Sequence, residues 1–118
     1  MSAPAHLLVV EDDPAVSRSL TRALRGAGYE VTAAASRAEA RLDGSFDVAV
    51  LDIELGDGSG LELAHALLTS EQVGSVVFHS ATPEPAVQKR ARELGVLVQK
   101  SGDLTGLLEA VARAIAAG

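Results

Sequence analysis

The sequence predicts an open α/β fold in which helices cover both faces of one parallel β-sheet. Segments with the pattern of strands and of helices alternate along the chain, and glycine or proline separates nearly every pair. Short connections between repeated strand–helix units require parallel strands with right-handed crossovers. The 118 residues are 47% apolar, which suffices for one core, so we expect a single domain over residues 1–118.

The first strand–helix unit begins with the apolar run Leu7–Val10. Asp13 is a suitable N-cap for the helix that follows, and Pro14 fits the first helical position. Gly26 and Gly28 end this helix. Its apolar residues have the spacing of a helix face: Val16, Leu20, Ala23, Leu24 and Ala27.

The second unit begins with Tyr29–Ala34, whose polar and apolar residues alternate as in a strand near a sheet edge. Ser36 and Glu39 form a capping-box pattern, which predicts a short helix ending at Gly44. The third unit begins with Phe46–Leu51. This run is almost continuously apolar, as expected for a central strand buried on both faces.

A glycine-rich loop, residues 56–58, follows the third strand. Ser59 and Glu62 form a second capping box and predict the start of the third helix. The apolar residues of that helix are Leu61, Ala64, Leu67 and Leu68.

Two further units complete the chain. Val76–Phe78 is the fourth strand, and a helix runs from Thr82 and Pro83 to Gly95. Val96–Val98 is the fifth strand. The last helix has an apolar stripe of Leu104, Leu107, Leu108, Val111 and Ile115. Five such units predict a flavodoxin-like (βα)5 fold with strand order 2-1-3-4-5.

Polar side chains gather where the predicted strands end. In such a sheet the binding site lies beyond the carboxyl ends of the strands, between the first and third. The residues at those ends are Glu11, Asp12 and Asp13 after the first strand, Asp52 after the third, Ser80 after the fourth and Lys100 after the fifth. Asp13 is interpreted as a helix cap, and His79 as a satisfied core or interface histidine.

The acidic residues of this group predict a metal site. Carboxylates at Glu11, Asp12 and Asp52 repel one another unless a cation offsets them, and an open site with oxygen ligands suits Mg²⁺. Once part of the charge is neutralised, Asp52 can attack a phosphoryl group and form an acyl phosphate. Lys100 would supply positive charge to the phosphoryl oxygens, and the Ser80 hydroxyl could hydrogen-bond the transferred group.

Four features together resemble the receiver domains of response regulators in two-component signalling: the acidic run, Asp52 after an apolar strand, Ser80 before an alanine, and Lys100. The resemblance covers essentially the whole chain. It implies a phosphorelay switch that catalyses no reaction beyond its own phosphorylation and dephosphorylation. The phosphoryl donor would be a sensor histidine kinase or a histidine phosphotransfer protein, and the output would pass to a downstream protein or to an effector domain missing from this sequence.

The resemblance also implies individual roles. Asp52 is the phosphoacceptor and a metal ligand, Asp12 binds Mg²⁺ directly, Glu11 binds it through a water, Glu54 binds it through its backbone carbonyl, Lys100 binds the phosphoryl group, and Ser80 is the switch hydroxyl. Glu54 and Thr82 would set the lifetime of the phosphoryl group. Phosphorylation would draw Ser80 inward, move the loop at Thr82 and change the partner-binding surface.

Three positions depart from the family pattern. Leu97 stands where an aromatic residue is usual, Gly56 replaces a common proline, and Ser101 replaces a proline that usually has a cis peptide bond. Because a non-proline cis bond costs about 2.5–4 kcal/mol, we expect a trans Lys100–Ser101 bond and an altered loop. These departures favour one alternative, a pseudo-receiver that binds proteins independently of phosphorylation.

Other functions fit the residues less well. Phosphatases of the haloacid-dehalogenase type carry a second aspartate two residues after the nucleophile, where this chain has Glu54 and no visible cap insert. A nucleotide-binding protein would need a phosphate-binding G-x-x-x-x-G-K-[ST] loop, which the sequence lacks.

The composition of the chain limits what the domain can bind and where it is expected to act. There is no cysteine, so disulfides and thiolate metal sites are excluded. A net charge of -6 argues against direct nucleic-acid binding by this domain. Without a long apolar run or a signal-peptide pattern, we expect a cytoplasmic protein that does not contact membrane.

Overall fold

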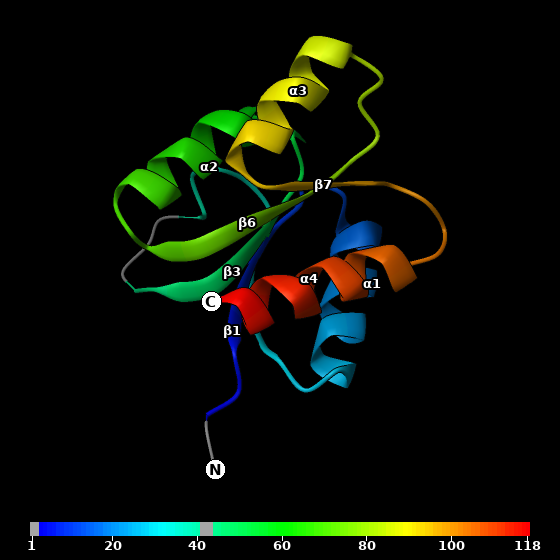
Figure 1. The fold of residues 1–118 in the computed structure, drawn as a ribbon. Coiled ribbons are helices and arrows are strands. Elements are labelled where there is room, and N and C mark those ends of the chain that lie inside the picture. The colour runs from blue at the N-terminus through cyan, green and yellow to red at the C-terminus, as the bar shows by residue number, and fades with distance from the viewer. Residues whose placement is uncertain (1–2, 41–43) are drawn as a thin grey trace.

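The computed structural model describes residues 3–40 and 44–118, and it has the predicted α/β architecture (Figure 1). Within these residues, five parallel strands form one sheet in the order β2-β1-β3-β6-β7. They are β1 (His6–Val10), β2 (Glu30–Ala34), β3 (Phe46–Leu51), β6 (Val73–Ser80) and β7 (Val96–Gln99). Numbered along the chain within this sheet alone, their order is 2-1-3-4-5, so the predicted topology is confirmed.

Helices cover both faces of the sheet. Helices α1 (Pro14–Gly26) and α4 (Thr105–Ala117) lie on one face, and α2 (Gly60–Thr69) and α3 (Pro85–Leu94) lie on the other (Figure 1). Successive residues of β1 alternate between the two resulting cores: Leu7 and Val9 pack on the α1 and α4 side, Leu8 and Val10 on the α2 and α3 side. Because both faces are covered, β1 and β3 need apolar residues at nearly every position.

The predicted helix caps are present. The Asp13 carboxylate accepts hydrogen bonds from the backbone N–H groups of Ala15, at 2.9 Å, and Val16, at 3.3 Å. The Ser59 hydroxyl accepts one from Leu61 N–H at 3.1 Å. Glu62 forms an ion pair with Arg37 at 3.3 Å, and no hydrogen bond from Glu62 to the backbone of Ser59 is found in the described residues.

Two elements differ from the prediction near the second and fourth helices. Residues 37–40 form hydrogen-bonded turns, with Ala40 N–H donating to Ser36 O at 3.1 Å, and the rest of the predicted second helix reaches residues outside the described ranges. Helix α3 begins at Pro85, later than the predicted start at Thr82. A proline disfavours helical backbone at the residue before it. Glu84 is therefore extended, and the helix begins at Pro85, which fits the first turn.

The loop after β3 contains a short element of regular structure. It forms a short antiparallel hairpin of β4 (Glu54–Leu55) and β5 (Gly58–Ser59), which the sequence pattern did not predict. Asp57 at its tip accepts hydrogen bonds from the backbone N–H groups of Arg37 and Ala38 at 3.0 and 3.1 Å. In the described part of the chain, none of the helices combines the length and the apolar character needed to span a membrane.

Candidate functional site at the carboxyl edge of the sheet

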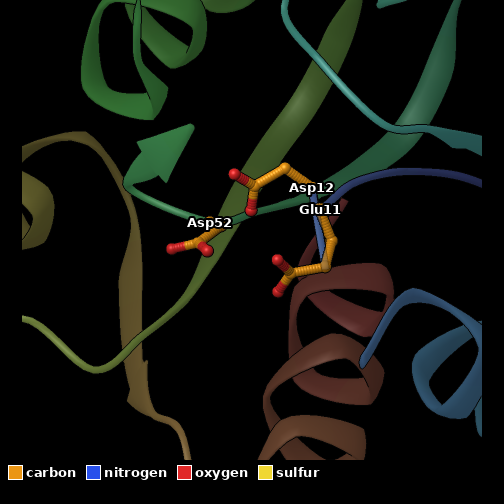
Figure 2. Close-up of side chains that lie close together, drawn as sticks. All are labelled: Glu11, Asp12 and Asp52. Carbon is orange, nitrogen blue, oxygen red and sulfur yellow. The ribbon is translucent and has the colours of Figure 1, made fainter. Parts of the chain in front are cut away.

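Three carboxylates converge where β1 and β3 end. Glu11 and Asp12 follow β1 directly, and Asp52 follows β3. The two strands pair with Val10 opposite Leu51, so their next residues lie at the same level of the sheet. One oxygen from each of the three side chains lies within 4.8 Å of the others, and Figure 2 shows the three groups at this edge.

Lys100 joins two of these carboxylates. Its Nζ lies 2.9 Å from Asp52 Oδ2 and 2.9 Å from Glu11 Oε1. Glu11 is 2% exposed and Asp52 7% exposed, so the lysine neutralises charge in a largely dry position. The Lys100 backbone N–H also donates to Ser80 O at 2.9 Å, which fixes the start of the loop after β7.

Serine at position 101, in place of the usual proline, does not prevent the contact between Lys100 and Asp52. The described residues contain no cis peptide bond, so the Lys100–Ser101 bond is trans, as predicted. The loop that follows is held by Ser101, whose hydroxyl donates to Asp103 O at 2.9 Å. Lys100 therefore reaches Asp52 from a loop built without proline.

The electrostatics of the cluster leave room for a divalent cation. Burial raises the pKa of Glu11, and the Asp52 charge raises it further, while Lys100 and the Asp13 N–H oppose the shift. Burial lowers the pKa of Lys100, but its contacts with Glu11 and Asp52 outweigh this and raise it overall. When all three carboxyl groups are ionised, they and the Lys100 ammonium carry a net charge of two negative units.

The donor set fits Mg²⁺. Asp12 is exposed and its carboxylate accepts no hydrogen bond from the described residues, so it is free to bind an ion. Asp52 and Glu11 lie beside it, and all the side-chain ligands are oxygens, as magnesium prefers. The position is open to solvent at Asp12, which leaves space for the waters that Mg²⁺ retains.

Glu54 lies two residues beyond Asp52, in β4. Its backbone N–H donates to Asp52 Oδ1 at 3.2 Å, so each Asp52 carboxylate oxygen already has one partner. The Glu54 side chain is exposed. Its backbone carbonyl as a metal ligand stays a prediction.

The remaining predicted residues lie along β6, β7 and the loop after β6. Ser80 is 1% exposed, and its hydroxyl accepts from Thr82 N–H at 3.3 Å and makes no bond to Asp52 within the described residues. Thr82 O accepts from the Gln88 side-chain amide at 3.0 Å, which connects this loop to α3. Leu97 is half-buried and packs against the core on the α2 and α3 side.

Gly60 is a residue of the site that the sequence did not reveal. An ideal Cβ at this position would lie 1.9 Å from the backbone oxygen of Asp52, so only glycine permits so close an approach. The Gly60 N–H also donates to Ile53 O at 2.7 Å. The first residue of α2 is thus packed directly against the backbone that carries Asp52. In the sequence, Gly60 merely follows a helix cap, and no local pattern marks it.

Gly60→Ala is expected to destabilise the domain by about 1–3 kcal/mol, the usual range for overpacking, because the new methyl group meets backbone and not a movable side chain. Urea unfolding measures the change. Gly26→Ala is the matched control, since a Cβ there meets nothing within 4 Å and alanine is the better helix former. Equal stability of the two variants would contradict the close packing at Gly60.

A five-stranded parallel sheet with an acidic cluster and a lysine at its carboxyl edge defines a class of signalling modules. The family model for the response regulator receiver domain matches residues 7–112. The chain therefore belongs to the response regulator receiver domain family.

Curated relatives agree with this family. The acid tolerance regulatory protein ActR of Sinorhizobium medicae is 33% identical over 110 residues, which cover 89% of this chain and 57% of ActR. The probable transcriptional regulatory protein TcrX of Mycobacterium tuberculosis is 38% identical over 90 residues, which cover 74% of this chain and 38% of TcrX. The match spans only about half of the length of these relatives, or less.

Solved structures share the fold. The response regulator TrrA of Thermotoga maritima, in complex with Mg²⁺-BeF, is 27% identical with a TM-score of 0.83, covering 93% of this chain and 98% of TrrA. The non-phosphorylated HemR receiver domain of Leptospira biflexa is 29% identical, also with a TM-score of 0.83, covering 94% of each chain.

Proposed function

We propose that this receiver domain is a phosphorylation-dependent switch in which Asp52 accepts a phosphoryl group in a Mg²⁺-dependent reaction. The donor is a sensor histidine kinase or a histidine phosphotransfer protein. The observation that carries the proposal is the position of Asp52 between the Lys100 ammonium, 2.9 Å away, and the open carboxylate of Asp12. This arrangement supplies a nucleophile with cationic groups on both sides once a metal is bound.

The chemistry is a transfer between two nucleophiles. An Asp52 oxygen forms a bond to phosphorus while the bond from phosphorus to the donor's histidine nitrogen breaks, and that nitrogen keeps the electron pair. Mg²⁺ held by Asp12 and Asp52, with Glu11 acting through a water, would neutralise charge on the carboxylate and on the transferred group. Lys100 and the Glu54 N–H, which already contact Asp52, are placed to bind phosphoryl oxygens.

The response to phosphorylation passes through Ser80. Its hydroxyl now accepts a hydrogen bond from Thr82 N–H, and a phosphoryl group on Asp52 would compete for that hydroxyl. A change at Thr82 reaches α3 through the Gln88 side chain. With Leu97 in place of a ring, this loop carries the change to the partner surface, which serves a downstream protein or an effector domain outside this sequence.

The pseudo-receiver alternative has less support. It rests on the residues that replace the usual proline and aromatic side chains, yet Lys100 contacts Asp52 and the three acidic residues lie together. The Mg²⁺-BeF complex of TrrA, a structural relative over nearly the whole chain, also favours the phosphorylation-dependent switch.

Beryllofluoride, a mimic of the phosphoryl group, tests the proposal. With Mg²⁺ present, it is expected to bind and to shift the backbone amide resonances of Ser80, Thr82 and Gln88 as well as those beside Asp52. Chelation of Mg²⁺ should abolish binding, because the carboxylates alone repel an anion. Failure to bind with Mg²⁺ present would refute the proposal, and shifts confined to the neighbours of Asp52 would refute the route through Ser80.

A further inference from the structure

The tip of the hairpin after β3 is tied to the segment that follows β2. Asp57 lies at the tip, and its two carboxylate oxygens accept hydrogen bonds from the backbone N–H groups of Arg37, at 3.0 Å, and Ala38, at 3.1 Å. The bond from Arg37 is the main reason that the pKa of Asp57 is lowered, so this carboxylate is ionised near pH 7. Hydrogen bonds to an ionised acceptor are stronger than those between neutral groups. We call this pair of bonds the hairpin clasp.

The segment that binds Asp57 is itself held in place. Ala40 is 3% exposed and belongs to the core on the α2 and α3 side, and its N–H donates to Ser36 O at 3.1 Å. Arg37 Nη1 forms an ion pair at 3.3 Å with Glu62 Oε2, in the first turn of α2. The hairpin tip is therefore tied to a part of the chain that is anchored both in the core and on α2.

The other end of the hairpin belongs to the functional site. Glu54 begins β4, and its backbone N–H donates to Asp52 Oδ1 at 3.2 Å. Within the hairpin, Glu54 pairs with Ser59, and Leu55 pairs with Gly58. A movement of the tip therefore reaches Glu54 through a ladder of only two residue pairs.

So small a hairpin needs contacts outside itself. A two-stranded hairpin is marginally stable at best in water, and β4 and β5 have only two residues each. Asp57 lies between Gly56 and Gly58, and glycine restricts the backbone less than any other residue. Because Gly56 stands where the family commonly has a proline, no ring stiffens this turn. The hairpin clasp supplies the constraint that the turn lacks.

We propose that Asp57 is a positioning residue for the magnesium site, because the hairpin clasp holds Glu54 beside Asp52 before any metal binds. This inference rests on the proposed function, in which Asp12, Asp52 and the Glu54 backbone carbonyl bind Mg²⁺. With the clasp intact, the site is already ordered. Without it, only a fraction of the molecules have Glu54 in place, and the apparent affinity for Mg²⁺ falls by that fraction.

Hydrogen exchange of the ¹⁵N-labelled domain, without metal, is the first measurement. Asp57→Ala removes both bonds of the clasp and is expected to speed exchange of the Glu54 amide by about three- to tenfold, the loss expected for hydrogen bonds of ordinary net strength. Asp57→Asn keeps one acceptor oxygen in place of two, so the Glu54 amide should exchange at an intermediate rate in that variant. Asp57 is exposed at a turn, so both variants are expected to fold.

Asp47→Ala is the matched control. Asp47 is also exposed, and its carboxylate also accepts a hydrogen bond from a backbone N–H, that of His6 at 2.8 Å. It lies near the amino end of β3, at the opposite edge of the sheet from the site. Exchange of the Glu54 amide and the affinity for Mg²⁺ should therefore stay as in wild type.

Calorimetric titration with Mg²⁺ is the second measurement. Asp57→Ala should bind Mg²⁺ about three- to tenfold more weakly than wild type. Its rate of phosphorylation by acetyl phosphate at saturating Mg²⁺ should match that of wild type, because saturating metal selects the ordered hairpin and the substitution leaves Asp52 and Lys100 unchanged. General damage to the site would lower the saturated rate as well.

Three results would overturn the inference. If Asp57→Ala binds Mg²⁺ as tightly as Asp47→Ala does, or if its Glu54 amide exchanges no faster, Asp57 does not position the site. If the rate at saturating Mg²⁺ falls along with the affinity, the substitution acts by general damage. A wild-type domain that binds no Mg²⁺ would refute the proposed function itself. The inference fails alone when wild type binds Mg²⁺ and Asp57→Ala binds it equally well, so the two failures are distinguishable.

Discussion

Asp52→Asn will abolish phosphorylation of the domain by acetyl phosphate in the presence of Mg²⁺. An amide is a far weaker nucleophile than a carboxylate, and the substitution removes a charge that the metal needs. Asparagine keeps an acceptor for the Glu54 N–H, and Lys100 keeps Glu11 as a partner, so the free energy of unfolding should stay within about 1 kcal/mol of wild type. Mass spectrometry of the intact protein detects the phosphoryl group.

Asp47→Asn is the matched control for this experiment. Asp47 lies on the same strand, β3, but at its amino end, where its carboxylate accepts from the His6 N–H at 2.8 Å. This variant should be phosphorylated as fast as wild type. A phosphorylated Asp52→Asn protein would show that the acceptor lies elsewhere, and the assignment of the site would be wrong.

The fold could be predicted because the sequence patterns of strands and helices repeat along the chain. The nearly continuous apolar run of β3 required cover on both faces, and five alternating units left little choice of topology. The same topology explains why the residues after β1 and β3 meet, since parallel neighbours end at the same edge. The proximity of these residues could therefore be predicted without knowing any side-chain contact.

The details that the sequence did not reveal depend on single contacts between distant segments. Gly60 must be glycine because the backbone of Asp52 passes beside it. The ion pair of Lys100 with Glu11 arises from the end of β7 reaching across to the end of β1. The sequence predicts a satisfied histidine at His79, yet its Nδ1 makes no hydrogen bond to any described residue. This likewise follows from what surrounds the ring, since periodicity places a side chain on a face without naming its partners. Tertiary contacts of this kind leave no local pattern.

Lys100→Met will slow phosphorylation of Asp52 by about 10²–10³-fold, the range seen when a preorganised group that stabilises developing charge is removed. The same substitution will tighten Mg²⁺ binding. In the described structure the ammonium lies 2.9 Å from Asp52 and 2.9 Å from Glu11, so it competes with a metal for these carboxylates. If the substitution only disrupted the structure of the site, the rate of phosphorylation and the affinity for Mg²⁺ would both fall. Lys89→Met, at the only other lysine in the sequence and exposed on α3, is the control and should change neither.

The stability of Lys100→Met should depend on pH in a defined direction. Without the ammonium, the pKa of buried Glu11 rises further above its ordinary value of 4.5, because burial and the Asp52 charge are no longer opposed by Lys100. An acid whose pKa is raised on folding destabilises the native state once it ionises. The loss in the free energy of unfolding, relative to wild type, is therefore complete above the pKa of Glu11 in the folded variant and disappears below 4.5. Urea unfolding across this range, with and without Mg²⁺, measures both effects. If Mg²⁺ restores none of the stability at neutral pH, or binds the variant no more tightly than wild type, the lysine and the metal do not share these carboxylates.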